Sequence, residues 1–118
     1  MSVCRLLLIV APPDPFRDSL RVLVQAEPRI THVALADSIV EGCRAIKQQL
    51  PERVIIDSNL PDSELWSFCT LLKTLAPSPH CVVIIHNHEQ RTAAQARALP
   101  TLLAGFRSES LFEAIFCE

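Results

Sequence analysis

The stretch that decides the fold is Val54-Ile55-Ile56-Asp57-Ser58-Asn59-Leu60-Pro61, a β-branched run that ends in one aspartate and a short proline-containing loop. A continuous apolar run of this length is typical of a strand buried on both faces. Two further apolar runs, residues 6–10 and 82–85, predict the strands on either side of it. If all three strands are parallel, Asp57 lies at the carboxyl edge of the sheet, where open α/β folds place their binding sites.

Outward from this stretch, strands and helices alternate along the whole chain. Strands are expected at residues 5–10, 32–35, 53–57, 81–86 and 101–104, from their apolar and β-branched runs. Helices are expected at residues 15–25, 39–50, 64–75, 91–99 and 109–117, from apolar residues at helical spacing, with a polar loop at 87–90. Five such strand–helix units predict a parallel sheet that is covered by helices on both faces.

Composition limits the class of protein. The 118 residues are 49% hydrophobic and 20% charged, as expected for one globular domain over residues 1–118. A net charge of −2 gives no electrostatic basis for binding nucleic acid, and no apolar run approaches the roughly 20 residues of a membrane helix. The five cysteines form no CxxC pair, which favours reduced thiols in a cytoplasmic protein.

Four pieces of sequence then point to a known family. They are Leu7-Leu8-Ile9-Val10, Phe16-Arg17-Asp18-Ser19-Leu20, Val54-Ile55-Ile56-Asp57 with Pro61 four residues on, and Leu111-Phe112-Glu113-Ala114-Ile115. Through them the chain resembles, over essentially its full length, the receiver domain of two-component response regulators. The helix end Ala26-Glu27-Pro28 is most similar to receivers with helix-turn-helix output domains. The resemblance implies a three-layer, flavodoxin-like α/β fold, a five-stranded parallel sheet of order 2-1-3-4-5, and a phosphoacceptor at the position of Asp57.

The resemblance also implies supporting residues that this chain lacks. The two acidic residues that hold Mg²⁺ in the family correspond to Ala11 and Pro12. The hydroxyl residue after the fourth strand corresponds to His86, the lysine after the fifth to Ala104, and the switch aromatic to Thr101. Of the family's pattern, Asp57 and Pro61 remain. Because cations must balance the charge of a phosphoryl group, we expect a degenerate receiver without catalytic residues, metal or cofactor.

Several residues around this predicted pocket allow two interpretations. Asp57 is either a surviving phosphoacceptor or a strand-end residue that accepts from a local amide. Asp14 is more simply a helix N-cap beside Pro15 than a displaced metal ligand. His86 is expected to fill the pocket and bond Asp57 or a backbone carbonyl, although His86 and His88 have spacing that could hold a transition metal with Asp57.

Three other side chains complete the set of candidate residues, and two of them are left with alternatives. Asn59 is a further neighbour of the pocket. Arg107 is by default a solvated loop residue that could reach the pocket from the other side, and Trp66 is either an exposed binding anchor or partly buried.

The expected function is that of a receiver-like signalling module that acts by protein–protein contact and is not an enzyme. Its partner would be a signalling protein or a second copy, bound through the surface of residues 91–99, 101–106 and 109–117, including Thr101, Phe106 and Arg107. Two alternatives stay open. One is a functional receiver that phosphorylates Asp57 with an atypical Mg²⁺ site, and the other is a constitutive dimerisation domain of a larger transcription regulator.

Overall fold

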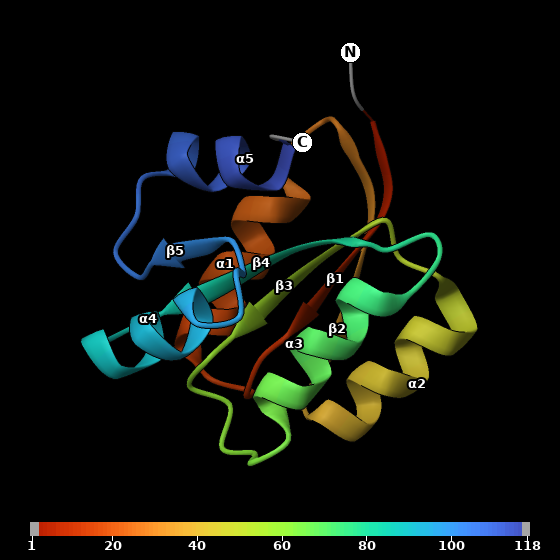
Figure 1. The fold of residues 1–118 in the computed structure, drawn as a ribbon. Helices are drawn as coiled ribbons and strands as arrows, with labels where there is room; N and C mark the ends of the chain where they lie inside the picture. Colours follow the sequence, from red (N-terminus) through yellow and green to blue (C-terminus); the bar gives the residue numbers. More distant parts are fainter. Residues whose placement is uncertain (1–2, 117–118) are drawn as a thin grey trace.

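The computed structural model describes residues 3–116 as a five-stranded parallel sheet between two layers of helices (Figure 1). The strands are β1 (Cys4–Val10), β2 (Ile30–Ala36), β3 (Arg53–Asp57), β4 (His80–Ile85) and β5 (Thr101–Leu103). The helices are α1 (Pro15–Gln25), α2 (Ile39–Gln49), α3 (Leu65–Thr74), α4 (His88–Gln95) and α5 (Ser108–Phe116). The predicted sheet order is confirmed as β2-β1-β3-β4-β5.

Strand β3 lies at the centre of the sheet because it pairs on both sides. Its Ile55 is in register with Ile9 of β1 and with Val82 of β4. Successive side chains of a strand point to opposite faces, so each central strand contributes to two cores. This is why the central strands read as continuous apolar runs in the sequence.

The two cores each hold one layer of helices in place. Val54 and Ile56 of β3 pack with the buried residues of α2, α3 and α4. Ile55 packs on the other face with the buried residues of α1 and α5, among them Leu20 and Leu111. A fully buried side chain of this size contributes about 1.5–3 kcal/mol through the hydrophobic effect. The sheet edge that carries Asp57 is therefore built on a rigid base.

The prediction for the fourth helix was wrong at both ends. Helix α4 spans His88–Gln95, so the loop expected at residues 87–90 is its cap and first turn. The side-chain oxygen of Asn87 accepts a hydrogen bond from the amide of Gln90 at 2.8 Å, which satisfies one free donor of that turn. At the other end Ala98 has a φ of +53°, so the helix has already ended two residues before Pro100.

Other boundaries differ by smaller amounts. Strand β2 is longer than expected because it pairs with β1 along its whole length, from Ile30 to Ala36. The strand expected at residues 81–86 runs instead from His80 to Ile85. Helix α5 begins at Ser108, one residue before its expected start, and its expected end at residue 117 lies outside the described residues.

Candidate functional site

Asp57 is the last residue of β3, and its side chain is only 1% exposed. Its Oδ1 atom accepts a hydrogen bond from the backbone amide of Asn59 at 3.0 Å. This local bond is the turn that aspartate makes with the backbone two residues on, and it starts the loop toward α3. Asp57 thus has the local capping role that was one of its two interpretations.

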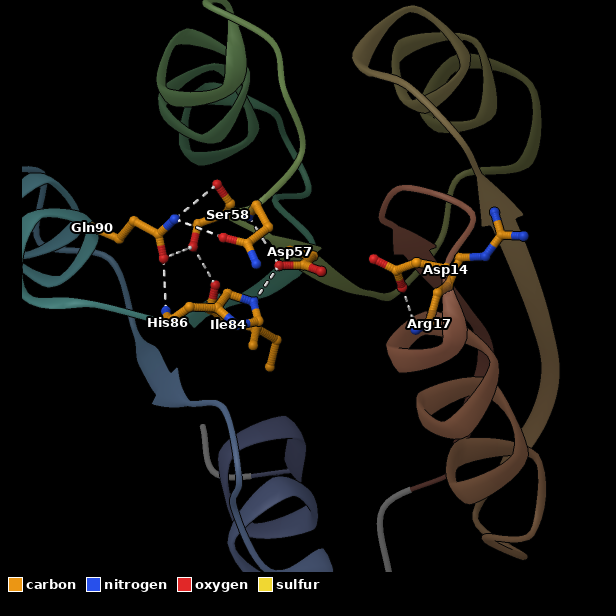
Figure 2. A network of polar contacts seen from close by, with 8 residues as sticks. Asp14, Arg17, Asp57, Ser58, Ile84, His86 and Gln90 are labelled. Carbon is orange, nitrogen blue, oxygen red and sulfur yellow. Dashed lines mark hydrogen bonds and ion pairs between the residues drawn. The ribbon is translucent and has the colours of Figure 1, made fainter.

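His86 contacts the same carboxylate oxygen. Its Nε2 atom lies 2.7 Å from Oδ1 of Asp57 (Figure 2). An ionised carboxylate only accepts hydrogen bonds, so the tautomer of His86 that fits an ionised Asp57 is the one that carries a proton on Nε2, and the contact is an ion pair when the imidazole is charged. The expected bond between His86 and Asp57 is therefore present, and it joins the ends of β3 and β4.

Aromatic rings hold His86 in this position. The imidazole meets the ring of Phe16 edge-on, with 5.4 Å between the ring centroids. Phe16 in turn meets Phe106 edge-on at 6.4 Å. Edge-to-face pairs of this kind contribute about 0.5–1.5 kcal/mol beyond the burial of the rings. Helix α1 and the loop before α5 therefore both support the position of the imidazole beside Asp57.

Gln90 of α4 connects the same two strand ends from the other side (Figure 2). Its Oε1 atom accepts from the backbone amide of His86 at 2.6 Å, and its Nε2 atom donates to Oδ1 of Asn59 at 3.0 Å. The hydroxyl of Ser58 lies 2.6 Å from the carbonyl oxygen of Ile84 and 2.8 Å from Oε1 of Gln90, so its one proton is available to either acceptor. The side-chain carboxamide of Gln90 therefore joins the loop after β3 to the end of β4.

Sequence reasoning missed Gln90. The residue was assigned to a loop, from which no direction of its side chain could be inferred. The signal that could have found it is Asn87, a preferred N-cap residue three positions before Gln90. With the helix begun at the right residue, Gln90 falls in its first turn, close to the carboxyl edge of the sheet.

The second carboxylate oxygen of Asp57, Oδ2, differs from Oδ1 in its hydrogen bonding. Oδ2 is buried and has no hydrogen-bond partner among residues 3–116. Figure 2 shows this oxygen directed away from His86. A buried acceptor without a partner costs about 1–3 kcal/mol, and more when it is charged. Oδ2 is therefore the oxygen of this carboxylate that forms no hydrogen bond with the described residues.

The residues around Oδ2 do not fit the Mg²⁺ ion that receivers use. Mg²⁺ is held by carboxylates and water, whereas the side chains of Ala11 and Pro12 offer no oxygen. Asp14 has the capping role that was the simpler of its two interpretations, because its Oδ1 accepts from the amide of Arg17 at 2.9 Å at the start of α1 (Figure 2). Within the described part of the chain, no three His, Cys, Asp or Glu side chains gather as metal ligands, so a site of Asp57, His86 and His88 is not formed either.

The other predicted residues lie farther from the chemistry. Ala104 is half-buried and only its amide is used, donating to the carbonyl of Ile85 at 2.8 Å. Arg107 is exposed, as its default interpretation had it. Pro61 is exposed in the loop after Asp57. Trp66 is half-buried, with the guanidinium of Arg97 5.4 Å above its ring, so it is not the exposed anchor that was one alternative.

Comparison with known proteins gives the chain its relatives. No family model matches it. The sensory transduction protein LytT of Enterococcus faecalis is 28% identical over 109 residues, which cover 92% of this chain and 45% of LytT. This chain therefore spans about half the length of the curated relative it matches.

Several solved structures resemble this chain in fold. A putative response regulator from Chloroflexus aurantiacus has a TM-score of 0.78 and 19% identity, over 92% of this chain and 91% of that one. A CheY-like receiver domain protein from Methanospirillum hungatei has a TM-score of 0.76 and 19% identity, over 95% and 90%. A LuxR-family two-component response regulator from Aurantimonas has a TM-score of 0.79 and 16% identity, over 95% and 81%.

At these identities the structural likeness shows the fold, which is the flavodoxin-like fold of response-regulator receivers. The resemblance inferred from the sequence is confirmed at this level. Within residues 3–116 no helix is long and apolar enough to span a bilayer.

Proposed function

We propose that this chain is a receiver-like module of a two-component or phosphorelay pathway in the cytoplasm, that it acts by protein–protein contact, and that its phosphorylation site is degenerate. The observation that supports this most is the 2.7 Å contact between Nε2 of His86 and Oδ1 of Asp57. In an active receiver a hydroxyl residue would stand at the place of His86 and leave room for the phosphoryl group. Here an imidazole fills that place.

The electrostatics of the site support the same proposal. A phosphoryl group brings negative charge beside a carboxylate, and catalysis of its transfer relies on positioning and on cations that neutralise that charge. Ala11, Pro12 and Ala104 stand where those cations or their ligands would be. Losing a single electrostatic donor typically costs about 10²–10³ in rate. With several of them absent, self-phosphorylation would be too slow to act as a switch.

The surface proposed for the partner consists of α4, β5 and α5. Strand β5 is at the edge of the sheet, and its Leu103 is exposed. Edge strands offer unpaired backbone groups and are natural contact sites. Arg107 is exposed beside this edge, and Thr101 and Phe106 are half-buried in it. Without a phosphorylation switch, this surface would hold one state, which a partner could change only through its own differential affinity.

One observation favours the alternative of a working phosphoacceptor. Oδ2 of Asp57 has no partner among the described residues, so one nucleophilic oxygen is available. The two proposals are separated by beryllofluoride, which mimics a phosphoryl group on aspartate, added with Mg²⁺ to the isotopically labelled protein. The degenerate site predicts no saturable shift of the amide signals of Asp57, Ser58 and Asn59. A saturable, Mg²⁺-dependent shift that Asp57→Asn abolishes would establish the alternative.

A further inference from the structure

Helices α2 and α3 lie side by side over one face of the sheet (Figure 1). Two apolar hollows lie between them, one near each end, and together they are called the α2–α3 groove. At one end of the groove, a hollow of about 250 Å³ is lined by residues that include Cys43, Glu64 and Leu71. At the other end, a hollow of about 290 Å³ is lined by Lys47 and by apolar residues such as Leu50. The two hollows therefore lie at opposite ends of the helix pair, on elements that the proposed signalling surface does not use.

Large apolar side chains border this groove and are exposed. Leu71, which lines one hollow, is 50% exposed, and Leu50, which lines the other, is 69% exposed. Val40, also on α2, is 66% exposed. Single exposed apolar residues need no explanation, but a group of them beside apolar hollows is typical of a protein–protein contact. The other large exposed apolar residues of the described chain, Val3, Val22, Leu35 and Leu103, are distributed over other elements.

Leu50 gives an independent indication. It ends α2 with a φ of +50°, a left-handed conformation in which glycine or asparagine is usual. For a residue with a side chain this conformation costs about 1–2 kcal/mol. In the isolated chain the side chain of Leu50 remains in solvent, so burial of that side chain does not offset the cost. Burial of the Leu50 side chain in an assembly would offset this cost.

Charges at the two ends of the groove are opposite. Glu64 lies just before α3 at one end, and Lys47 lies in the last turn of α2 at the other. Neither the carboxylate of Glu64 nor the ammonium of Lys47 forms an ion pair with any of residues 3–116. A surface with an acid at one end and a base at the other is complementary to itself when one copy is turned end for end.

From this arrangement we propose that the α2–α3 groove binds a second copy of this chain in an antiparallel, two-fold symmetric dimer. The two-fold axis lies in the plane of the contact and crosses the line from Lys47 to Glu64 at a right angle, so Lys47 of each copy faces Glu64 of the other. The apolar side chains of Leu50 and Leu71 fill the hollows of the opposite copy. An interface of this kind uses the same patch twice, as two-fold dimers require.

The choice of a second copy over another protein rests on the two charges. An unrelated partner would have to present a base and an acid at the right separation, whereas a second copy does so by symmetry. The contact is also independent of phosphorylation, because Asp57 lies at the sheet edge and takes no part in it. The dimer therefore leaves α4, β5 and α5 free for another protein.

Sedimentation equilibrium of the purified chain, from low micromolar to submillimolar concentration, tests the dimer. We expect the average mass to rise toward that of two chains in the wild type. Leu71→Asp is expected to give a monomer at every concentration, and Val22→Asp, an equally exposed position on α1, is expected to leave the dimer unchanged. Circular dichroism and thermal unfolding verify that each variant is folded, since both positions are on the surface.

Exchange of the charges at Lys47 and Glu64 tests their contribution to the Kd of the dimer. Lys47→Glu and Glu64→Lys are each expected to weaken the dimer by about tenfold in Kd, because each change creates two repulsive pairs per dimer. The double variant is expected to return to near the wild-type Kd. A monomeric wild type would overturn the proposal. So would a dimer that Leu103→Asp abolishes and Leu71→Asp does not, which would place the contact on β5.

Discussion

Nε2 of His86 lies 2.7 Å from Oδ1 of Asp57, and this contact joins the carboxyl ends of two neighbouring strands at the position where the fold carries its chemistry. The same oxygen also accepts from the amide of Asn59. The carboxylate therefore has a structural role that an open phosphorylation site would not give it. The consequences of this role can be measured.

Removal of the imidazole should destabilise the fold. His86→Ala takes away the hydrogen bond to a buried carboxylate and the edge contact with Phe16, so we expect the free energy of unfolding to fall by about 1–3 kcal/mol. Urea denaturation measures this value. His88→Ala, two residues on and exposed, is the matched control and should stay within about 0.5 kcal/mol of wild type. Equal losses in the two variants would contradict a structural role of His86.

Gln90 should matter through its hydrogen bonds. Gln90→Ala removes the acceptor of the His86 amide and the donor to Asn59, and we expect a loss of about 1–2 kcal/mol in the free energy of unfolding. Hydrogen exchange of the His86 amide should become faster in this variant. Gln95→Ala, on the exposed surface of the same helix, supplies the comparison. Unchanged protection of the His86 amide would show that the connection does not exist in solution.

Asp14 should act as a cap and not as a metal ligand. Asp14→Ala is expected to lower the free energy of unfolding by about 1 kcal/mol, whereas Asp14→Ser, which keeps a capping oxygen, should lose little. Addition of Mg²⁺ should stabilise neither the wild type nor the variants. Stabilisation by Mg²⁺ that Asp14→Ser loses would instead assign the carboxylate a role in binding metal.

One acidic residue should make stability depend on pH. The side chain of Arg29 donates to the carboxylate of Glu27 at 2.6 Å and lowers the pKa of Glu27 from its ordinary value of 4.5. A carboxyl whose pKa is lower in the folded state stabilises the fold above its unfolded pKa, and this contribution is lost as the pH falls through the folded pKa. The difference in unfolding free energy between wild type and Glu27→Gln should therefore be largest above pH 4.5 and shrink below it. A difference that does not change with pH would contradict the pairing.

The apolar runs were enough to predict a parallel sheet and the place of Asp57, because strands buried on both faces leave long apolar runs and a single acid at the end of one is conspicuous. The order of the strands followed from the resemblance to receiver domains. The sequence also led to the bond between His86 and Asp57, since the residues that follow adjacent parallel strands meet at one edge. The start of α4 was missed because Asn87 was assigned to a polar loop, and Gln90 was missed with it. The groove between α2 and α3 could not be predicted, because the exposure of Val40 and Leu71 depends on how the two helices pack against the sheet and against each other.

The most direct test of the central claim is the covalent state of Asp57. The wild-type chain and Asp57→Asn are incubated with a small phosphoryl donor and Mg²⁺, and intact mass is measured alongside a catalytically competent receiver as positive control. We expect the competent receiver to gain about 80 Da, the mass of one phosphoryl group, and the wild-type chain to keep its original mass. A Mg²⁺-dependent gain of that mass in the wild type, absent from Asp57→Asn, would contradict it.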